Sequence, residues 1–363
     1  MQAGVEFRGV TKRFGGPDSP LVVQGIDFTV PRGTLTTLLG PSGCGKTTTL
    51  RMIAGLETPS GGRILIDGQD VTTLGPSERN VSMVFQSYAL FPHLTVIGNV
   101  GYGLQVSGVS AAETRSRARA ALQAVGLTGY DDRLPSELSG GQQQRVAVAR
   151  SLVLEPSVLL FDEPLSNLDA RLRRSMREEI RSLQQRLKLT VAYVTHDQGE
   201  ALAVSDQIIV MDQGRIAQAG TPQDLYERPG STFVAGFMGE AMLFDAVADG
   251  QGGIRLGPLS LNPPHAAAAR GAVKVAVRPE AWAVTDPASS AIAPSDGSPP
   301  AGRLAGRILR TAYLGSAFEL TLDTELGEIF VVTPDVAVAW APGQAVHLHL
   351  RGRGVSVVAG APA

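Results

Sequence analysis

A buried strand that runs directly into a glycine-rich loop and then into a helix leaves few folds open to this chain. Residues 35–39, LTTLL, have the apolar character of a strand covered on both faces, and Gly40 to Thr47 follow as GPSGCGKT. The next stretch, TTTLRMIA, carries apolar residues at helical spacing and meets Gly55 where a helix would stop. This order predicts an α/β fold.

The alternation of strand and helix recurs further along the chain. Two short apolar runs, VLLFD and TVAYVT, are separated by the amphipathic stretch LDARLRRSMREEIRSLQQRL. This pattern predicts a parallel sheet with helices on both faces. Asp162, Glu163 and His196 stand at or just after the ends of these strands. Open α/β sheets bind ligands at that end of their strands, so we expect all three residues at a ligand site.

The last third of the chain has a different character. After about Gly239, short β-like runs such as KVAVRP, FELTLD and IFVVTP alternate with Gly and Pro turns, which predicts a small all-β barrel. We therefore expect one domain over residues 1–239, with a mainly helical subdomain at about 87–156, and a second domain over 240–363. Residues 286–302 have the composition of a flexible loop.

Composition and charge exclude several classes of protein. The 363 residues carry a formal net charge of −2, so no basic field indicates a nucleic-acid partner. Cys44 is the single cysteine, so no internal disulfide can form and nothing indicates an oxidising compartment. No run reaches the roughly 18 apolar residues of a membrane span, and the first residues lack the apolar core of a secretory signal. We expect a chain that works in the cytoplasm and does not cross a membrane by itself.

The first glycine loop has the chemistry of a phosphate site. Gly40 to Thr47 fit G-x-x-x-x-G-K-[ST] without a mismatch, between a strand and a helix. Glycines let backbone N–H groups converge on phosphate, and the helix presents its positive end to the anion. Lys46 would reach the β and γ phosphates, and the Thr47 hydroxyl would ligate Mg²⁺. A chance glycine loop is the alternative reading.

An acidic pair supplies the second half of a nucleotide site. Asp162 ends a buried strand and is suited to hold Mg²⁺, and Glu163 is suited to act as general base on a water that attacks the γ phosphate. The alternative is a solvated acidic pair.

A second glycine segment, ELSGGQQQR, places Ser139 as an N-cap before Gly140 and Gly141, which makes another helix start open to an anion. Taken alone, the segment would favour the alternative reading, a capped helix whose glycines allow close packing.

The pair GPSGCGKTT and LSGGQ, followed by Asp162 and Glu163, resembles the ATP-binding-cassette (ABC) ATPases over nearly all of residues 1–240. The resemblance implies a P-loop NTPase cassette, a RecA-like core plus helical subdomain, followed by an OB-like, TOBE-type β domain. It also implies a head-to-tail dimer with ATP and Mg²⁺ as ligands. In such a dimer the signature segment of one subunit closes over the ATP of the other, so that Ser139, Gly141 and Gln142 contact the γ phosphate of the second copy.

The resemblance assigns further roles residue by residue. Phe14 matches the aromatic residue that stacks on adenine, although the family often has Tyr there, and a core aromatic is the alternative. Gln86 matches the glutamine that touches Mg²⁺ and the attacking water, and His196 matches the histidine at the γ phosphate. Asp169 matches the loop that organises the dimer contact. The residues expected to bind nucleotide are Phe14, Gly40, Pro41, Ser42, Gly43, Cys44, Gly45, Lys46, Thr47, Thr48, Ser139, Gly140, Gly141, Gln142 and Asp169, with Glu163, His196 and Gln86 as catalytic residues and Thr47, Gln86 and Asp162 as metal ligands.

ABC ATPases use ATP hydrolysis in transport, in translation or in DNA repair, and each is a candidate function for this chain. One cassette, no heptad insertion and no basic arm favour transport. VRPE and YLGS in the β region resemble the end of importer cassettes, and NVGYGL and FMGEAMLF look most like the ferric-iron importers, with phosphonate, polyamine and sugar importers as alternatives. The resemblance implies two membrane permease subunits, a periplasmic binding protein and a peripheral position at the cytoplasmic face of the inner membrane. The β domain is then either a regulatory sensor or a dimer strut.

Coupling to a permease is expected around Gln86 to Leu104. Tyr88, Leu90, Phe91 and Leu94 would form an exposed apolar groove there, or would instead pack inside the helical subdomain.

Overall fold

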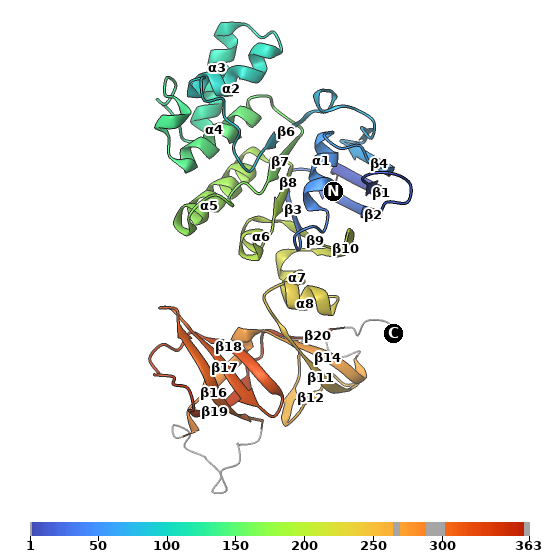
Figure 1. Cartoon of the computed structure of the whole chain (residues 1–363), viewed down its shortest axis with the longest axis vertical. Coiled ribbons are helices and arrows are strands. Elements are labelled where there is room, and N and C mark those ends of the chain that lie inside the picture. The colour runs from blue at the N-terminus through green and yellow to red at the C-terminus, as the bar shows by residue number, and fades with distance from the viewer. Residues whose placement is uncertain (1, 264–268, 288–301, 359–363) are drawn as a thin grey trace. The chain divides into compact units, whose positions relative to one another are not determined.

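The computed structural model describes residues 2–263, 269–287 and 302–358 (Figure 1). The chain divides into two compact units, residues 1–222 and 223–363. Most of the predicted loop at 286–302 lies outside the described residues.

The central sheet of the first unit is largely parallel, as predicted. Its six strands lie in the order β10-β9-β3-β8-β7-β6. The pairs β3/β8, β3/β9, β6/β7 and β7/β8 are parallel, and only the edge pair β9/β10 is antiparallel. The strands are β3 (Leu35–Leu39), β6 (Val81–Val84), β7 (Val158–Asp162), β8 (Val191–Thr195), β9 (Gln207–Asp212) and β10 (Arg215–Gly220).

Helices cover both faces of this sheet because its central strands are apolar on both sides. Successive side chains of a strand point to opposite faces. Leu160 accordingly packs in the core that contains helix α1 (Lys46–Ala54), whereas Leu159 and Phe161 pack with the helix α5 (Ala170–Leu187). The apolar runs and the amphipathic stretch seen in the sequence therefore form the layers that were predicted.

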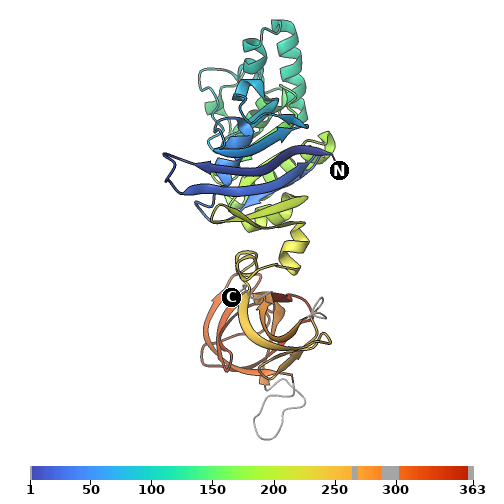
Figure 2. The same cartoon turned by 90° about the vertical axis from the view of Figure 1, so that its right-hand side faces the viewer.

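A second sheet, antiparallel, covers the α1 side of the first unit (Figure 2). It has the order β2-β1-β4-β5, and the rings of Phe7 and Phe28 stack on its inner face with centroids 4.4 Å apart. Its strands are β1 (Ala3–Arg13), β2 (Leu21–Pro31), β4 (Gly61–Ile66) and β5 (Gln69–Asp70).

The stretch between β6 and β7 is mainly helical, as expected for about 87–156. Helices α2 (Val96–Val106), α3 (Ala111–Ala124) and α4 (Gly140–Leu152) enclose a core of their own that includes Val100, Leu122 and Val146. A one-turn 3₁₀ helix at Pro135–Glu137 lies between α3 and α4, and another at Pro76–Glu78 precedes β6. Helix α6 (Gln198–Val204) follows β8.

The second unit is mostly antiparallel β, which confirms the predicted change of character. After α7 (Pro222–Glu227) and α8 (Thr232–Phe237), two five-stranded sheets in the orders β13-β12-β11-β14-β20 and β15-β19-β16-β17-β18 share one apolar core around Trp282. The strands are β11 (Met242–Asp249), β12 (Ile254–Leu256), β13 (Leu259–Leu261), β14 (Arg270–Val277), β15 (Trp282–Thr285), β16 (Leu304–Tyr313), β17 (Phe318–Thr324), β18 (Gly327–Thr333), β19 (Ala345–Leu350) and β20 (Val355–Val358), with a 3₁₀ turn at Pro279–Ala281.

Within the described part of the chain, no helix has both the length and the apolar character that a bilayer span requires.

Candidate nucleotide-binding and hydrolysis site

The first glycine loop connects β3 to α1 and is closely packed. A Cβ at Gly40 would lie 2.3 Å from the carbonyl oxygen of Met211, so this position accepts only glycine. Gly45 is the N-cap of α1 with φ of 102°, and no side chain caps the helix. The first N–H groups of α1 are therefore available to an anion. Lys46 is buried and its Nζ lies 2.7 Å from the carbonyl oxygen of Gly40, so the cation is held within the loop.

Asp162 and Thr47 meet where the first loop faces the end of β7. Their Oδ1 and Oγ1 atoms are 3.4 Å apart. Burial raises the pKa of Asp162, and the positive charge of Arg51 partly opposes this effect. A carboxylate and a hydroxyl are hard oxygen donors of the kind that Mg²⁺ prefers, so this pair fits the predicted metal site.

Glu163 and His196 lie side by side although 33 residues separate them. His196 Nδ1 is 3.1 Å from Glu163 Oε2, and the Glu163 N–H donates to the carbonyl oxygen of Val194 in β8. Glu163 has φ of 45°, in the left-handed region that non-glycine residues rarely adopt. Such strain is found where the surroundings hold a functional side chain in place. The predicted base and the predicted histidine therefore share one edge of the sheet.

Gln86 follows β6 on the same side of the sheet and is exposed. Its carbonyl oxygen accepts a hydrogen bond from Asn167 Nδ2 at 3.1 Å, which ties it to the loop after Glu163. The next residues, Tyr88 and Ala89, have φ of 59° and 45°. The segment after β6 is thus as irregular as the segment after β7.

Ser139 is the N-cap of α4, as predicted. Its hydroxyl accepts from the N–H of Gln142 at 3.4 Å, and Gln142 Oε1 accepts from the N–H of Ser139 at 2.9 Å, which is a capping box. A Cβ at Gly141 would lie 2.9 Å from Leu172 at the start of α5, where Asp169 is the N-cap. Among the described residues, no hydrogen bond joins this signature segment to the phosphate loop of the same chain.

Phe14 follows the end of β1 and is 50% exposed, so the alternative of a core aromatic is wrong. The ring is covered on one face only in part, by Lys12 Nζ at 4.7 Å from its centroid. An exposed ring of this kind is available for stacking.

The chain matches two known protein-family models. Residues 23–166 match the model of the ABC transporter family, and residues 275–358 match the TOBE domain. The chain is 51% identical over 358 residues to the "Fe(3+) ions import ATP-binding protein FbpC" of Agrobacterium fabrum (strain C58), with 98% of this chain and 97% of that protein covered. It is 48% identical over 359 residues to the protein of the same name from Escherichia coli (strain K12), with 98% of each covered. The chain belongs to the ATP-binding proteins of ABC transporters.

Solved structures agree with this ABC assignment. One similar structure is cbiO1 from Clostridium perfringens, which is described as part of the ABC transporter complex cbiONQ. It superimposes with a TM-score of 0.59 at 29% sequence identity, and the match covers 63% of this chain and 92% of the cbiO1 chain. A second is the ATP-binding cassette MJ0796, described as a dimeric post-hydrolysis state bound to ADP and Pi. Its TM-score is 0.53 at 30% sequence identity, and the match covers 60% of this chain and 98% of the MJ0796 chain. The chain is an ABC ATPase that binds ATP, with a P-loop cassette followed by a TOBE domain.

Neither alternative for the ABC coupling segment describes Tyr88, which packs in the core of the sheet and α5 and not in the separate core of the helical subdomain. Tyr88 is buried in the core beside β7 and β8, so the groove prediction is wrong for this residue. Phe91 is only partly buried and packs against the exposed ring of Tyr102, with centroids 4.6 Å apart. Asn99 holds the loop from Phe91 to Thr95 in place. Its side chain accepts from the Phe91 N–H at 2.8 Å and donates to the carbonyl oxygens of Phe91, Leu94 and Thr95.

Two residues near the site escaped the sequence interpretation. Arg150 on α4 donates to the carbonyl oxygens of Tyr88 and Ala89 at 2.9 and 2.7 Å, and so holds the left-handed segment after Gln86. Glu200 on α6 is buried next to the His196 turn. For Arg150 the available signal was a charged residue inside the otherwise apolar stretch AVARSL. Glu200 stands among other polar residues in HDQGEAL, so the sequence contains no comparable signal for it.

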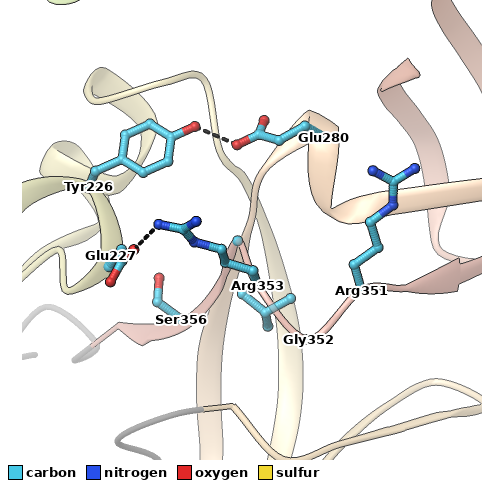
Figure 3. Close-up of a pocket in the computed structure, with 9 residues that line it drawn as sticks. Tyr226, Glu227, Glu280, Arg351, Gly352, Arg353 and Ser356 are labelled. Carbon is cyan, nitrogen blue, oxygen red and sulfur yellow. Dashed lines mark hydrogen bonds and ion pairs between the residues drawn. The ribbon is translucent and has the colours of Figure 1, made fainter. Parts of the chain in front are cut away.

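The second unit contains a cavity of about 480 Å³, across which two pairs of lining side chains are hydrogen-bonded (Figure 3). Tyr226 donates to Glu280, and Arg353 Nη2 lies 2.6 Å from Glu227 Oε1. Burial, followed by the bond to Glu280, raises the pKa of Tyr226 to about 12. The lining consists of Tyr226, Glu227, Glu280, Arg351, Gly352, Arg353, Gly354, Val355 and Ser356.

Proposed function

We propose that this chain is the ATP-hydrolysing subunit of an importer, and that Glu163 and His196 carry out the hydrolysis. The observation that supports it best is the 3.1 Å contact between these two side chains beside the Thr47–Asp162 pair, at the end of one parallel sheet. A carboxylate and an imidazole that follow strands next to the phosphate-loop strand are suited to activate water and to contact a γ phosphate.

In the proposed mechanism the phosphates of ATP lie on the loop from Gly40 to Thr48, with Lys46 at the β and γ phosphates and Phe14 stacked on adenine. Glu163 accepts a proton from the water that attacks the γ phosphorus. The contact of Nδ1 with Glu163 orients the His196 ring and leaves Nε2 to face the γ phosphate.

Thr47, Asp162 and Gln86 would hold Mg²⁺, which would neutralise negative charge on the phosphates. Thr47 Oγ1 and Asp162 Oδ1 already lie 3.4 Å apart, and the exposed Gln86 side chain would supply a further oxygen ligand.

Substitution of the two side chains tests the assignment. Glu163→Gln and His196→Ala should each lower ATP turnover by about 10²- to 10⁴-fold, the usual contribution of proton-transfer groups. Binding of a non-hydrolysable ATP analogue, measured by calorimetry, should remain within a few-fold of wild type. Normal hydrolysis by either variant would refute the role of that residue.

A second copy of the chain would complete the site. The capping box of Ser139 and Gln142 is exposed at its N-cap, and in the described part of the chain it makes no hydrogen bond to its own phosphate loop. The MJ0796 cassette is described as a dimer. We infer that Ser139, Gly140, Gly141 and Gln142 close over the γ phosphate of a partner copy, with Asp169 at the contact. Turnover per chain should therefore fall on dilution. Undiminished activity of a monomer shown by light scattering would contradict the dimer.

The relatives named as Fe(3+) import proteins support Fe³⁺ as the cargo. The chain would then act as a peripheral protein at the cytoplasmic face of the inner membrane, with two permease subunits and a periplasmic binding protein. Cells that lack this chain should lose high-affinity ⁵⁵Fe³⁺ uptake but keep phosphonate, polyamine and sugar uptake. Loss of one of the latter instead would reassign the cargo.

We propose residues 1–239 for the ATPase domain, with its helical subdomain at about 87–156, and 240–363 for a regulatory β domain. The compact units of the structure divide after residue 222, which groups α7 and α8 with the β sheets. The cavity in Figure 3 supports a regulatory role, because it offers space and polar groups outside the nucleotide site.

A further inference from the structure

Glu200 is a buried carboxylic acid directly behind the proposed catalytic pair. It lies in the first turn of α6 and is only 3% exposed. A small cavity of about 50 Å³ is lined by Glu163, His196 and Glu200 together with residues of the neighbouring turns. A buried acid is costly unless hydrogen bonds satisfy it, so its presence here needs an explanation.

Both oxygens of this carboxyl group have a donor from β8. The Tyr193 hydroxyl donates to Oε1, and the Thr195 hydroxyl donates to Oε2 at 2.8 Å. Tyr193 and Thr195 are two residues apart in a strand and so point to the same face, and both are buried. Burial raises the pKa of Glu200, and the bonds from Tyr193 and Thr195 oppose that effect.

The same network encloses His196 from both sides along the chain. The Thr195 oxygen that donates to Glu200 also accepts from the Asp197 N–H at 3.0 Å. Asp197 Oδ1 in turn accepts from the Glu200 N–H at 2.8 Å. The residues immediately before and after His196 are thus both tied to Glu200. The hydroxyl proton of Thr195 points to Glu200, which directs an oxygen lone pair toward Asp197.

We propose that Glu200 is a positioning residue that, through Thr195 and Asp197, holds His196 against Glu163. This inference rests on the proposed roles of Glu163 and His196 in hydrolysis. An apolar side chain would fill the same space, but it would not orient the Thr195 hydroxyl. The carboxylate is required because it accepts from two hydroxyl groups at once.

Glu200→Gln keeps the shape and replaces one acceptor oxygen with an NH₂ donor, so one hydroxyl must turn its proton away. We expect kcat for ATP to fall by about 10- to 100-fold, the cost of a small misplacement at a catalytic group. KM and the affinity for a non-hydrolysable ATP analogue should change less than twofold. Thr195→Val should reproduce this loss, because it removes the link to Asp197.

Tyr193→Phe is the matched control, since it removes the other donor but leaves the Thr195 bond in place. It should lower the thermal unfolding midpoint while kcat stays within about threefold of wild type, because it does not touch the turn at His196. In ¹³C-histidine NMR spectra of the five-histidine chain, Glu200→Gln should shift the signal that His196→Ala removes, and Tyr193→Phe should not.

Wild-type kcat in Glu200→Gln, or an unshifted His196 signal in that folded variant, would overturn the positioning role. Equal losses of kcat in Tyr193→Phe and Glu200→Gln would also overturn it, because they would indicate general destabilisation. Normal turnover by His196→Ala would instead refute the proposed function itself. The two failures are therefore distinguishable.

Discussion

The sheets of the two units use strand direction in different ways. In the first unit β3, β6, β7 and β8 are parallel, so their carboxyl ends lie along one edge (Figure 1). That edge collects the phosphate loop, the Asp162–Glu163 pair and His196 from distant parts of the sequence. The described strand pairs of the second unit are all antiparallel, so consecutive strand ends alternate between two edges. A parallel sheet gathers functional residues, whereas the antiparallel sheets mainly enclose a core.

The two units also have one feature in common. Each contains a buried arginine that donates hydrogen bonds to backbone carbonyl oxygens. Arg79 donates to the carbonyl oxygens of Met52 and Ile53 at the end of α1. Arg278 donates to those of Tyr226 and Ala235 on α7 and α8. Burial lowers the pKa of both side chains. Each arginine ties helical ends to the rest of its own unit.

The largest expected effect tests whether the edge of the parallel sheet binds ATP. Lys46→Ala removes a buried cation from the phosphate loop. Loss of one member of a buried charge pair typically costs 2–5 kcal/mol, so ATP affinity should fall at least about 30-fold. Calorimetric titration with ATP measures this directly. Affinity close to wild type would mean that the loop does not hold the triphosphate.

Substitution of the two buried arginines, Arg79 and Arg278, tests the stability of each unit in turn. Arg79→Met and Arg278→Met should each lower the free energy of unfolding by about 2–4 kcal/mol, since each leaves buried carbonyl oxygens without a donor. Hydrogen exchange should show loss of protection in β1 and α1 for the first variant and in α7, α8 and β14 for the second. Uniform loss of protection across both units in either variant would contradict the role of each arginine within its own unit.

Cys44 reports on the first unit alone, because it is the only cysteine of the chain. It is 4% exposed, and burial raises the pKa of its thiol more than Lys46 lowers it. A raised pKa reduces the thiolate fraction at a given pH, so labelling at pH 8 should be at least about 10-fold slower than in urea and should keep rising at higher pH. Complete labelling of Cys44 with ATP binding intact would refute its place in the loop.

The smallest effect is the control for the first prediction. Lys274 pairs with Asp245 on the surface of the second unit at 2.7 Å. Exposed ion pairs contribute little to stability, so Lys274→Ala should leave ATP affinity, turnover and Tm unchanged within error. A clear fall in turnover would show that this β surface takes part in hydrolysis.

Features that depend on neighbours in the sequence were predictable from the sequence alone. The phosphate loop, the N-cap at Ser139 and the apolar strands β3, β7 and β8 all follow from residues within one turn or one strand. Capping, backbone freedom of glycine and side-chain alternation are local effects, and they persist in most tertiary contexts. These effects also defined the family resemblance.

Only the tertiary structure decided which of these residues meet. The Glu163–His196 contact, the exposure of Phe14, the burial of Tyr88 and the roles of Arg150 and Glu200 all depend on segments far apart in the chain. Burial of a charged or aromatic side chain is set by what packs over it, and periodicity in one segment contains no information about that neighbour. The sequence therefore determined the chemical groups of the site, and the packing of the parallel sheet determined their arrangement.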